Sequence, residues 1–253
     1  MSKKETKTEI VTNDNTTSTA PAATDVSSES FMELQSGIQT IMNLGLAEKL
    51  YLEDLSDRLF YIDDVITPDI LHTITMQIYK YNGCDCYIEP ECRKPIILVF
   101  NSCGGSVFDG IGLMDAIRNS NTPVIGICVG YAESMAFNIF AVCHHRFAVP
   151  NAIFMYHDGY EDTGMTTSTK AKDWAKFSPR VDERINKMIA EKTKFTPEYL
   201  QTINPHDTFW FADELKEWSM VDGIIGRDVD MGDLFSFMSD LVVCDCEECT
   251  CHE

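Results

Sequence analysis

Between residues 51 and 226, short apolar runs alternate with longer segments in which apolar residues recur at helical spacing. The clearest run, residues 96–100 (IILVF), is too short and too rich in β-branched residues to be a helix. It is followed by the turn sequence NSCGGS and then by residues 109–119, whose apolar side chains fall on one helical face. This alternation predicts an α/β fold built from βα units around a mostly buried sheet.

The same patterns predict the individual elements. Strands are expected at residues 59–62, 96–100, 124–129, 147–149 and 153–156. Helices are expected after Pro68, at 109–119 and 134–143, from about 168 to 194, and from near Pro197. The segment 134–143 is apolar nearly all round, which predicts a helix that is buried on every side. Because proline removes a backbone donor, Ser178-Pro179 is expected to kink or break the helix at 168–194.

The two ends of the chain differ from this central region in composition. Residues 1–30 carry almost no large apolar side chains and are predicted to be a disordered arm, while residues 31–50 suit a short helix or a docking segment. Residues 227–253 hold eight acidic residues and one basic residue, which predicts a solvated or partner-facing acidic tail. The expected domain is therefore 51–226.

Charge and cysteine content narrow the function classes. Twenty basic against forty acidic residues give a net charge of -20, which argues against nucleic-acid binding because phosphate contacts need basic side chains. No apolar run reaches the ~18–20 residues that cross a bilayer, and the start MSKKETKTEI lacks the apolar core of a signal peptide. We therefore expect a cytoplasmic protein without a membrane partner, with its ten cysteines as reduced thiols.

Two predicted strands end in glycine-containing turns, one at Gly104-Gly105 and one running from Gly130 to Ser134. In α/β folds, ligands collect at the carboxyl ends of the strands, so these turns are the expected floor of a site. A glycine pair exposes backbone N–H groups that can hold an anion or an oxyanion. Ser134, beside the N–H of Met135, has the surroundings of a nucleophile, but a serine at this place is also an ordinary helix N-cap. The pattern leaves both interpretations open.

A nucleophilic serine needs a base, and His157 follows directly after a predicted buried strand, where its ring would project from a rigid element. A single histidine is also commonly structural. Three carboxylates could orient the ring, namely Asp158, Asp162 and Asp207, and composition does not rank them. The residues thus predict a candidate Ser–His–acid site without fixing its acid.

Five sequence blocks follow one another along the chain: FNSCGGSV at 100–107, ICVGYAESMA at 127–136, RFAVPN at 146–151, MYH at 155–157 and DTFWFA at 207–212. In this order they resemble the proteolytic subunit of the ATP-dependent Clp protease. Residues 212–225 resemble the closing helix and last strand of that family, so the resemblance covers roughly residues 50–226. It implies the crotonase-like α/β fold of repeated ββα and βα units, with the helix at 168–194 as the "handle" that joins two rings.

The resemblance also implies a role for individual residues. Ser134 is the expected nucleophile, His157 the general base and Asp207 the acid that fixes the imidazole. The backbone N–H groups of Gly105 and Met135 are the expected oxyanion hole. The implied activity is that of a serine endopeptidase that hydrolyses unfolded proteins and assembles with itself as heptameric rings stacked in pairs. A partner AAA+ unfoldase would use the ATP, and this chain would need no metal or nucleotide.

Several positions depart from the family pattern. Cys103 stands where a proline is usual, Glu133 stands where a small residue is usual, and Asp158 could compete with the expected acid for the histidine ring. A break at Ser178-Pro179 would disturb the contact between rings. These departures leave open a catalytically silent structural subunit, and the polar arm and acidic tail leave open a viral or self-processing maturation protease of the same fold.

The remaining cysteines cluster in two segments. Residues 244–252 (CDCEECTCH) contain four thiols and an imidazole, which suits zinc, although zinc ligands usually come as C-x-x-C pairs across a longer loop. A solvated tail without metal is the alternative. Residues 81–93 (YNGCDCYIEPECR) look like an insertion and are expected to form an edge loop. Cys128 and Cys143 lie within apolar runs and are predicted to be core residues.

Overall fold

The computed structural model describes residues 45–159 and 167–234. Residues 45–49, at the start of α2 (Leu46–Asp57), belong to a separate unit, and the fold given below is that of the chain from residue 50 onward. The predicted arm at 1–30 lies outside the described residues, as do most of 31–50 and the cysteine cluster at 244–252. The predicted domain boundaries therefore stay predictions.

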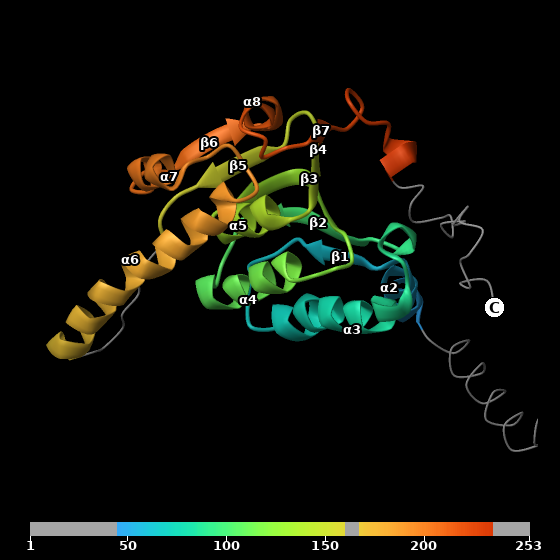
Figure 1. Cartoon of the computed structure of the whole chain (residues 1–253), viewed down its shortest axis with the longest axis horizontal. Helices are drawn as coiled ribbons and strands as arrows, with labels where there is room; N and C mark the ends of the chain where they lie inside the picture. Colours follow the sequence, from blue (N-terminus) through green and yellow to red (C-terminus); the bar gives the residue numbers. More distant parts are fainter. Residues whose placement is uncertain (1–44, 160–166, 235–253) are drawn as a thin grey trace, which may run out of the picture. The chain divides into compact units, whose positions relative to one another are not determined.

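Seven strands form one sheet, which is parallel except at one edge (Figure 1). The strands are β1 (Leu59–Ile62), β2 (Ile96–Ser102), β3 (Val124–Glu133), β4 (His145–Ala148), β5 (Ile153–Tyr156), β6 (Thr208–Phe211) and β7 (Gly223–Ile224). The main order is β1-β2-β3-β4-β7. β3 has two partners beyond β2, since its first half pairs with β4 and its last residues pair with β5. β6 then adds to β5 as the antiparallel strand.

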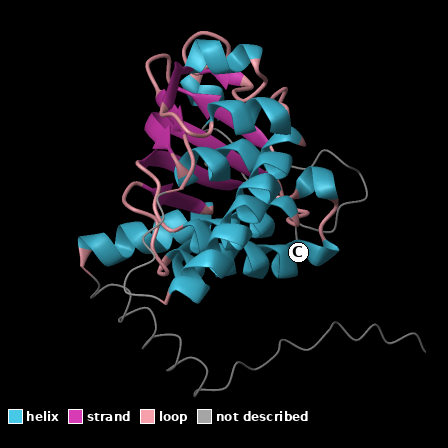
Figure 2. Ribbon diagram, turned by 90° about the vertical axis from the view of Figure 1, so that its left-hand side faces the viewer, coloured by secondary structure: helices cyan, strands magenta, loops and turns pink. Residues whose placement is uncertain are grey.

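Helices connect the strands, and Figure 2 shows most of them on one side of the sheet. They are the π-helical turn η1 (Leu71–Thr75), α3 (Met76–Cys84), α4 (Val107–Arg118), α5 (Met135–Val142), α6 (Ser168–Ala190), α7 (Pro197–Ile203) and α8 (Ala212–Glu217), with 3-10 turns η2 (Asp85–Tyr87) and η3 (Pro90–Cys92). The predicted alternation of strands and helices is thus confirmed. Pro68 lies in a turn ahead of its helix, which opens with the π-helical turn η1.

α5 lies at the centre of the core. Each of its eight residues is buried, as its uninterrupted apolar sequence predicts. Phe137 packs against Tyr156 and Trp210, while Phe140 packs edge-on against Phe100 and also contacts Phe154. α5 therefore packs against residues of β2, β5 and β6, and these contacts make its first turn a rigid support for the residue that precedes it.

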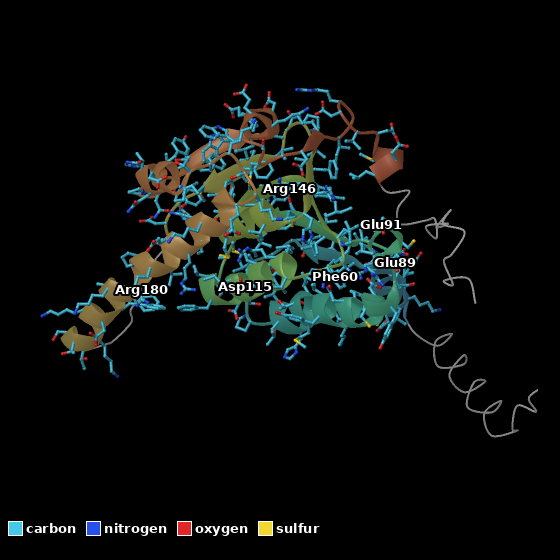
Figure 3. The ribbon with its side chains drawn as sticks, in the orientation of Figure 1. Phe60, Glu89, Glu91, Asp115, Arg146 and Arg180 are labelled. Atoms are coloured by element: carbon cyan, nitrogen blue, oxygen red, sulfur yellow. The ribbon has the colours of Figure 1, made fainter. Side chains whose placement is uncertain are left out.

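The far end of α5 is fixed by Arg146, which β4 carries into the interior (Figure 3). Its guanidinium donates to the carbonyl oxygens of Ala141 and Cys143 and forms an ion pair with Asp222 at 3.1 Å. Because a buried guanidinium needs such partners, these contacts tie the last turn of α5 to the β4–β7 edge of the sheet.

Two element predictions are wrong. The predicted strand 124–129 continues to Glu133, because the residues that look like a turn from Gly130 onward pair with β5. Of the kink or break predicted at Ser178-Pro179, the break does not occur, since α6 runs from Ser168 to Ala190 with Pro179 inside it. The carbonyl of Ala175, which loses its intrahelical donor there, belongs to an exposed residue, so water can satisfy it.

The acidic tail predicted from residue 227 onward to be solvated or partner-facing is described as far as residue 234, and these residues are mostly exposed, with two apolar exceptions. Val229 forms a bridge with Ile225, and Leu234 is only 2% exposed. Leu234 joins a second apolar cluster with Leu59, Ile97 and other strand residues, on the face of the sheet opposite the main core. The acidic composition of the tail gave no indication that the side chains of Val229 and Leu234 pack against this face of the sheet.

The predicted edge loop at 81–93 is instead largely helical, comprising the end of α3 and the turns η2 and η3. Arg58 forms a bidentate ion pair with the buried Asp85, which also accepts from Thr122. Burial raises the pKa of Asp85, but these donors outweigh it and the net pKa is lowered. The segment is thereby anchored to the body.

The cysteines divide by environment. Cys128 and Cys143 are buried as predicted, and burial raises the pKa of each thiol to about 12. Cys84, Cys86 and Cys103 are free and exposed. The expectation that all ten thiols are reduced is wrong at Cys92, which is disulfide-bonded. Within the described ranges no helix is both long and apolar enough to cross a bilayer.

Candidate active site

Ser134 occupies the sharp turn between β3 and α5. Its φ of 53° and ψ of −121° lie in a region that non-glycine residues rarely adopt, at a cost on the order of 1–3 kcal/mol. Its N–H donates to the Met155 carbonyl at 2.8 Å, and its own carbonyl accepts from Asn138. The turn is thus imposed by β5 on one side and by the buried helix on the other. A strained strand–turn–helix of this kind projects a serine hydroxyl out of the backbone.

The N-cap interpretation of this serine is not supported. Ser134 has the N-cap position of α5, yet in the described part of the chain its side chain caps no backbone N–H of that helix. Its Oγ instead lies 2.9 Å from Nε2 of His157. The hydroxyl is therefore directed at a base.

His157 and the carboxylate beside it are brought together by strand register. His157 directly follows β5, Asp207 directly precedes β6, and the antiparallel pairing of Tyr156 with Thr208 sets the two residues opposite each other. His157 Nδ1 lies 3.0 Å from Asp207 Oδ1. The histidine side chain is 7% exposed and that of Asp207 is 54% exposed.

The other carboxylates have different positions. The N–H of Asp158 donates to the Asn204 carbonyl at 2.7 Å, which fixes the chain just after His157. Asp162 lies outside the described residues. Of the acids that the sequence leaves unranked, Asp207 is the one seen on Nδ1 of the histidine.

The Gly104-Gly105 turn packs directly against the Ser134 turn. Gly104 has a φ of 94°, and a Cβ there would stand 2.7 Å from the Glu133 carbonyl oxygen and 2.8 Å from the Met135 nitrogen. Gly105 has a φ of 147°, and a Cβ there would collide with the backbone of Ile66. Both positions therefore require glycine, for conformation and for space.

Two backbone N–H groups near Ser134 have no acceptor in their own secondary-structure element. Ile66 forms a parallel bridge with Gly105, in which the Ile66 N–H donates to the Gly104 carbonyl and the Ile66 carbonyl accepts from the Ser106 N–H. Because successive N–H groups of an extended segment alternate in direction, the N–H of Gly105 is directed away from Ile66. Met135 is the first residue of α5, and its N–H has no acceptor within the helix. The arrangement suits a pair of donors for an oxyanion at the positive end of a helix dipole.

A cleft of about 530 Å³ opens over these groups. The glycine turn and the Ser134–His157 pair form its floor, and side chains from α4 and α6 form its walls: Val107, Phe108, Trp174, Ser178, Val181 and Asp182. Phe108 meets Trp174 edge-on with ring centroids 5.9 Å apart. The cleft thus has room for an extended chain and an aromatic wall against which an apolar group can pack.

The sequence analysis missed the contribution of α6 to the cleft. Trp174, Ser178 and Val181 follow the i, i+4, i+7 spacing of one helical face, which is the signal that could have revealed it. The expected break at Pro179 obscured that face.

His144, unlike His157, has a structural role. It follows α5, and its Nδ1 accepts from the Val124 N–H at 2.9 Å. Burial, together with nearby cations, lowers the pKa of His144 to about 4, so the ring is neutral near pH 7. It is a structural acceptor that ties α5 to the start of β3.

Comparison with protein families identifies a match over most of the described domain. The model of the Clp protease family matches residues 62–228, about two thirds of the chain. The match spans Ser134, His157, Asp207 and both glycine-containing turns.

Proposed function

The chain belongs to the Clp protease family, and from this premise and the geometry of the site we propose that it is a serine endopeptidase. The predicted α/β fold is the fold of this family, with α6 as the long handle helix. The observation that carries the proposal is the continuous contact from Ser134 Oγ through His157 to Asp207. No other nucleophile–base–acid line is present among the described contacts.

In the proposed reaction, Ser134 Oγ attacks the carbonyl carbon of a peptide bond while His157 Nε2 takes the hydroxyl proton. Asp207 holds the ring through Nδ1 and stabilises the imidazolium that forms. The N–H groups of Gly105 and Met135 donate to the oxyanion, an interaction whose loss typically costs ~10²–10³ in rate. His157 then protonates the leaving amine, and water hydrolyses the acyl-enzyme by the reverse sequence.

The proposed substrate is an unfolded polypeptide, supplied by an AAA+ unfoldase that hydrolyses ATP. This chain uses no metal or nucleotide in the mechanism. The proposed assembly consists of heptameric rings of the same chain, stacked in pairs, in the cytoplasm. An exposed apolar strip on β3, β5 and β6 supports association, since isolated domains rarely leave such strips uncovered: Val129, Ile153, Phe209 and Phe211.

No described contact favours either alternative function, the silent structural subunit or the viral or self-processing protease. The hypothesis of a silent structural subunit rests on Cys103, Glu133 and Ser178-Pro179, and the last of these loses weight because α6 continues through Pro179. No observation on the described residues favours a viral or self-processing role.

Degradation of an unfolded protein and of a fluorogenic peptide tests the proposal. The wild-type ring is expected to cleave both, Ser134→Ala neither, and the control Ser56→Ala, an exposed serine on α2, is expected to match the wild type. Hydrolysis that survives in Ser134→Ala would overturn the assignment of the nucleophile.

A further inference from the structure

Asn138 is a buried polar residue that the proposed mechanism does not use. It lies on α5 one turn after Ser134, and only 7% of it is exposed. Its Nδ2 faces the Met135 sulfur at 3.8 Å, while its Oδ1 has no hydrogen-bond partner among the described residues. A buried amide oxygen without a donor is costly, and native proteins seldom keep one without a reason.

A small cavity lies at this side chain, directly behind the reacting pair. It has a volume of about 20 Å³, and its lining includes Ser134, Met135, Asn138, Tyr156, His157 and Asn186. This volume is sufficient for one water molecule, which needs roughly 10–15 Å³ and two to four polar partners. An apolar cavity of that size stays dry, but this one is lined largely by polar side chains.

Suitable partners for a water are present. Asn138 Oδ1 is an acceptor with no donor among the described residues, and Tyr156 Oη donates to Asn186 Oδ1 while keeping a lone pair that can accept. A water that donates to both Asn138 and Tyr156 would link α5 to β5. These are the two elements that carry Ser134 and His157.

We propose that one water molecule, bound in this cavity by Asn138, braces the Ser134–His157 pair from behind, and that Asn138 is a positioning residue for catalysis. The inference rests on the proposed function of the pair. The water joins α5 and β5 at the points where the nucleophile and the base leave them, so it helps to hold Ser134 Oγ at 2.9 Å from His157 Nε2. Small losses of such alignment have large kinetic effects, ~10²-fold for a 1 Å misplacement.

Two substitutions separate positioning from stability. Asn138→Leu keeps the number and branching of the side-chain heavy atoms but is bulkier, so it removes the acceptor and displaces the water, and Tm is expected to change little. We expect labelling of Ser134 by a fluorophosphonate to slow about 10-fold, and peptidase kcat to fall with KM unchanged. Asn138→Ser keeps an acceptor and leaves room for water, so its rate is expected to exceed that of Asn138→Leu although its Tm is lower. A merely structural role predicts that rate follows Tm.

Ile139→Val is the matched control on the same helix, since Ile139 is fully buried and not part of the cavity lining. It should lower Tm slightly and leave the labelling rate unchanged. Labelling of Asn138→Leu at the wild-type rate would overturn the positioning role.

A high-resolution crystal structure of the assembled wild-type protein tests the water directly. Density for a water within hydrogen-bond distance of Asn138 Oδ1 is expected, and a cavity without one would overturn the inference. This result does not depend on activity. Wild-type protein that forms rings and is never labelled would instead overturn the proposed function, so the two failures are distinguishable.

Discussion

Helices α5 and α6 both contribute to the candidate site, yet they are opposite in character. α5 has eight residues, all buried, and it positions Ser134. α6 has 23 residues, and its buried ones, Ile185, Asn186, Met188 and Ile189, lie in the last third, while the α6 residues that line the cleft are only half-buried. The groups proposed for bond cleavage thus stand on the rigid core, while the proposed substrate wall stands on an element that solvent and partners can reach.

The largest expected effect concerns the reacting groups held by the buried core. Asp207→Asn should reduce kcat by about 10⁴-fold while leaving the fold intact, because the amide no longer favours the reactive tautomer of His157. Asp158→Asn is the matched control, with a small effect, since Asp158 is anchored through its backbone to Asn204. Steady-state kinetics on a fluorogenic peptide measure both. Equal losses in the two variants would show that the acid is misassigned.

The next effect concerns the close approach of the glycine turn to the base of α5. Gly104→Ala places a methyl within 2.8 Å of the Met135 nitrogen, so the turn must shift and the proposed oxyanion donors with it. We expect kcat to fall about 10²-fold and Tm to fall as well.

Gly112→Ala on α4 is the control for that substitution, because a methyl there meets no atom of the described residues within 4 Å. It should raise stability by about 0.5–1 kcal/mol at unchanged kcat. Activity lost in Gly112→Ala as well would mean that the effect at Gly104 is not local.

On α6 the expected effect is smaller and of another kind. Trp174→Ala removes half of the aromatic pair with Phe108 in the cleft wall and should raise KM about 3- to 10-fold with little change in Tm. Lys176→Ala, at an exposed position of the same helix outside the cleft lining, should leave KM unchanged. A fall in kcat alone for Trp174→Ala would show that α6, like α5, positions the reacting groups, and the contrast between the two helices would then not hold.

The last expected effect is on the pH dependence of stability near α5, away from the site. In the folded protein the pKa of His144 is lowered to about 4, whereas the unfolded chain binds the proton near pH 6.5. Acidification between these values therefore favours unfolding, and Tm should fall as the pH falls from 6.5 to 4. His144→Asn keeps an acceptor for the Val124 N–H without titrating, so the slope should flatten. His206→Asn, at an exposed histidine that is not among the groups acting on His144, should leave the slope unchanged. An unchanged slope in His144→Asn would refute the assignment.

The sequence predicted those features that depend on local patterns. The all-apolar segment 134–143 became the buried helix α5, and β1 and β5 have the predicted bounds. The predictions were wrong where the structure of a segment depends on contacts with residues far away in the sequence. β3 extends through Gly130 because β5 pairs with it, and Leu234 is buried because the far face of the sheet needs a cover.

The candidate site shows the same division. The glycine turn and Ser134 could be identified from strand ends and helix starts. Asp207 could not be selected by spacing, because its place opposite His157 is set by the antiparallel register of β5 and β6, and only the family resemblance pointed to it. Asn138 was not singled out, since a single polar residue in an apolar segment has no recognisable pattern until its surroundings are known.

The most direct test of the central claim is intact-mass analysis of the assembled protein after treatment with a fluorophosphonate. We expect a single adduct on the wild type and none on Ser134→Ala, because only a serine activated by its base and oxyanion donors reacts at an appreciable rate. An assembled wild-type ring without an adduct, or an adduct that persists in Ser134→Ala, would contradict the account.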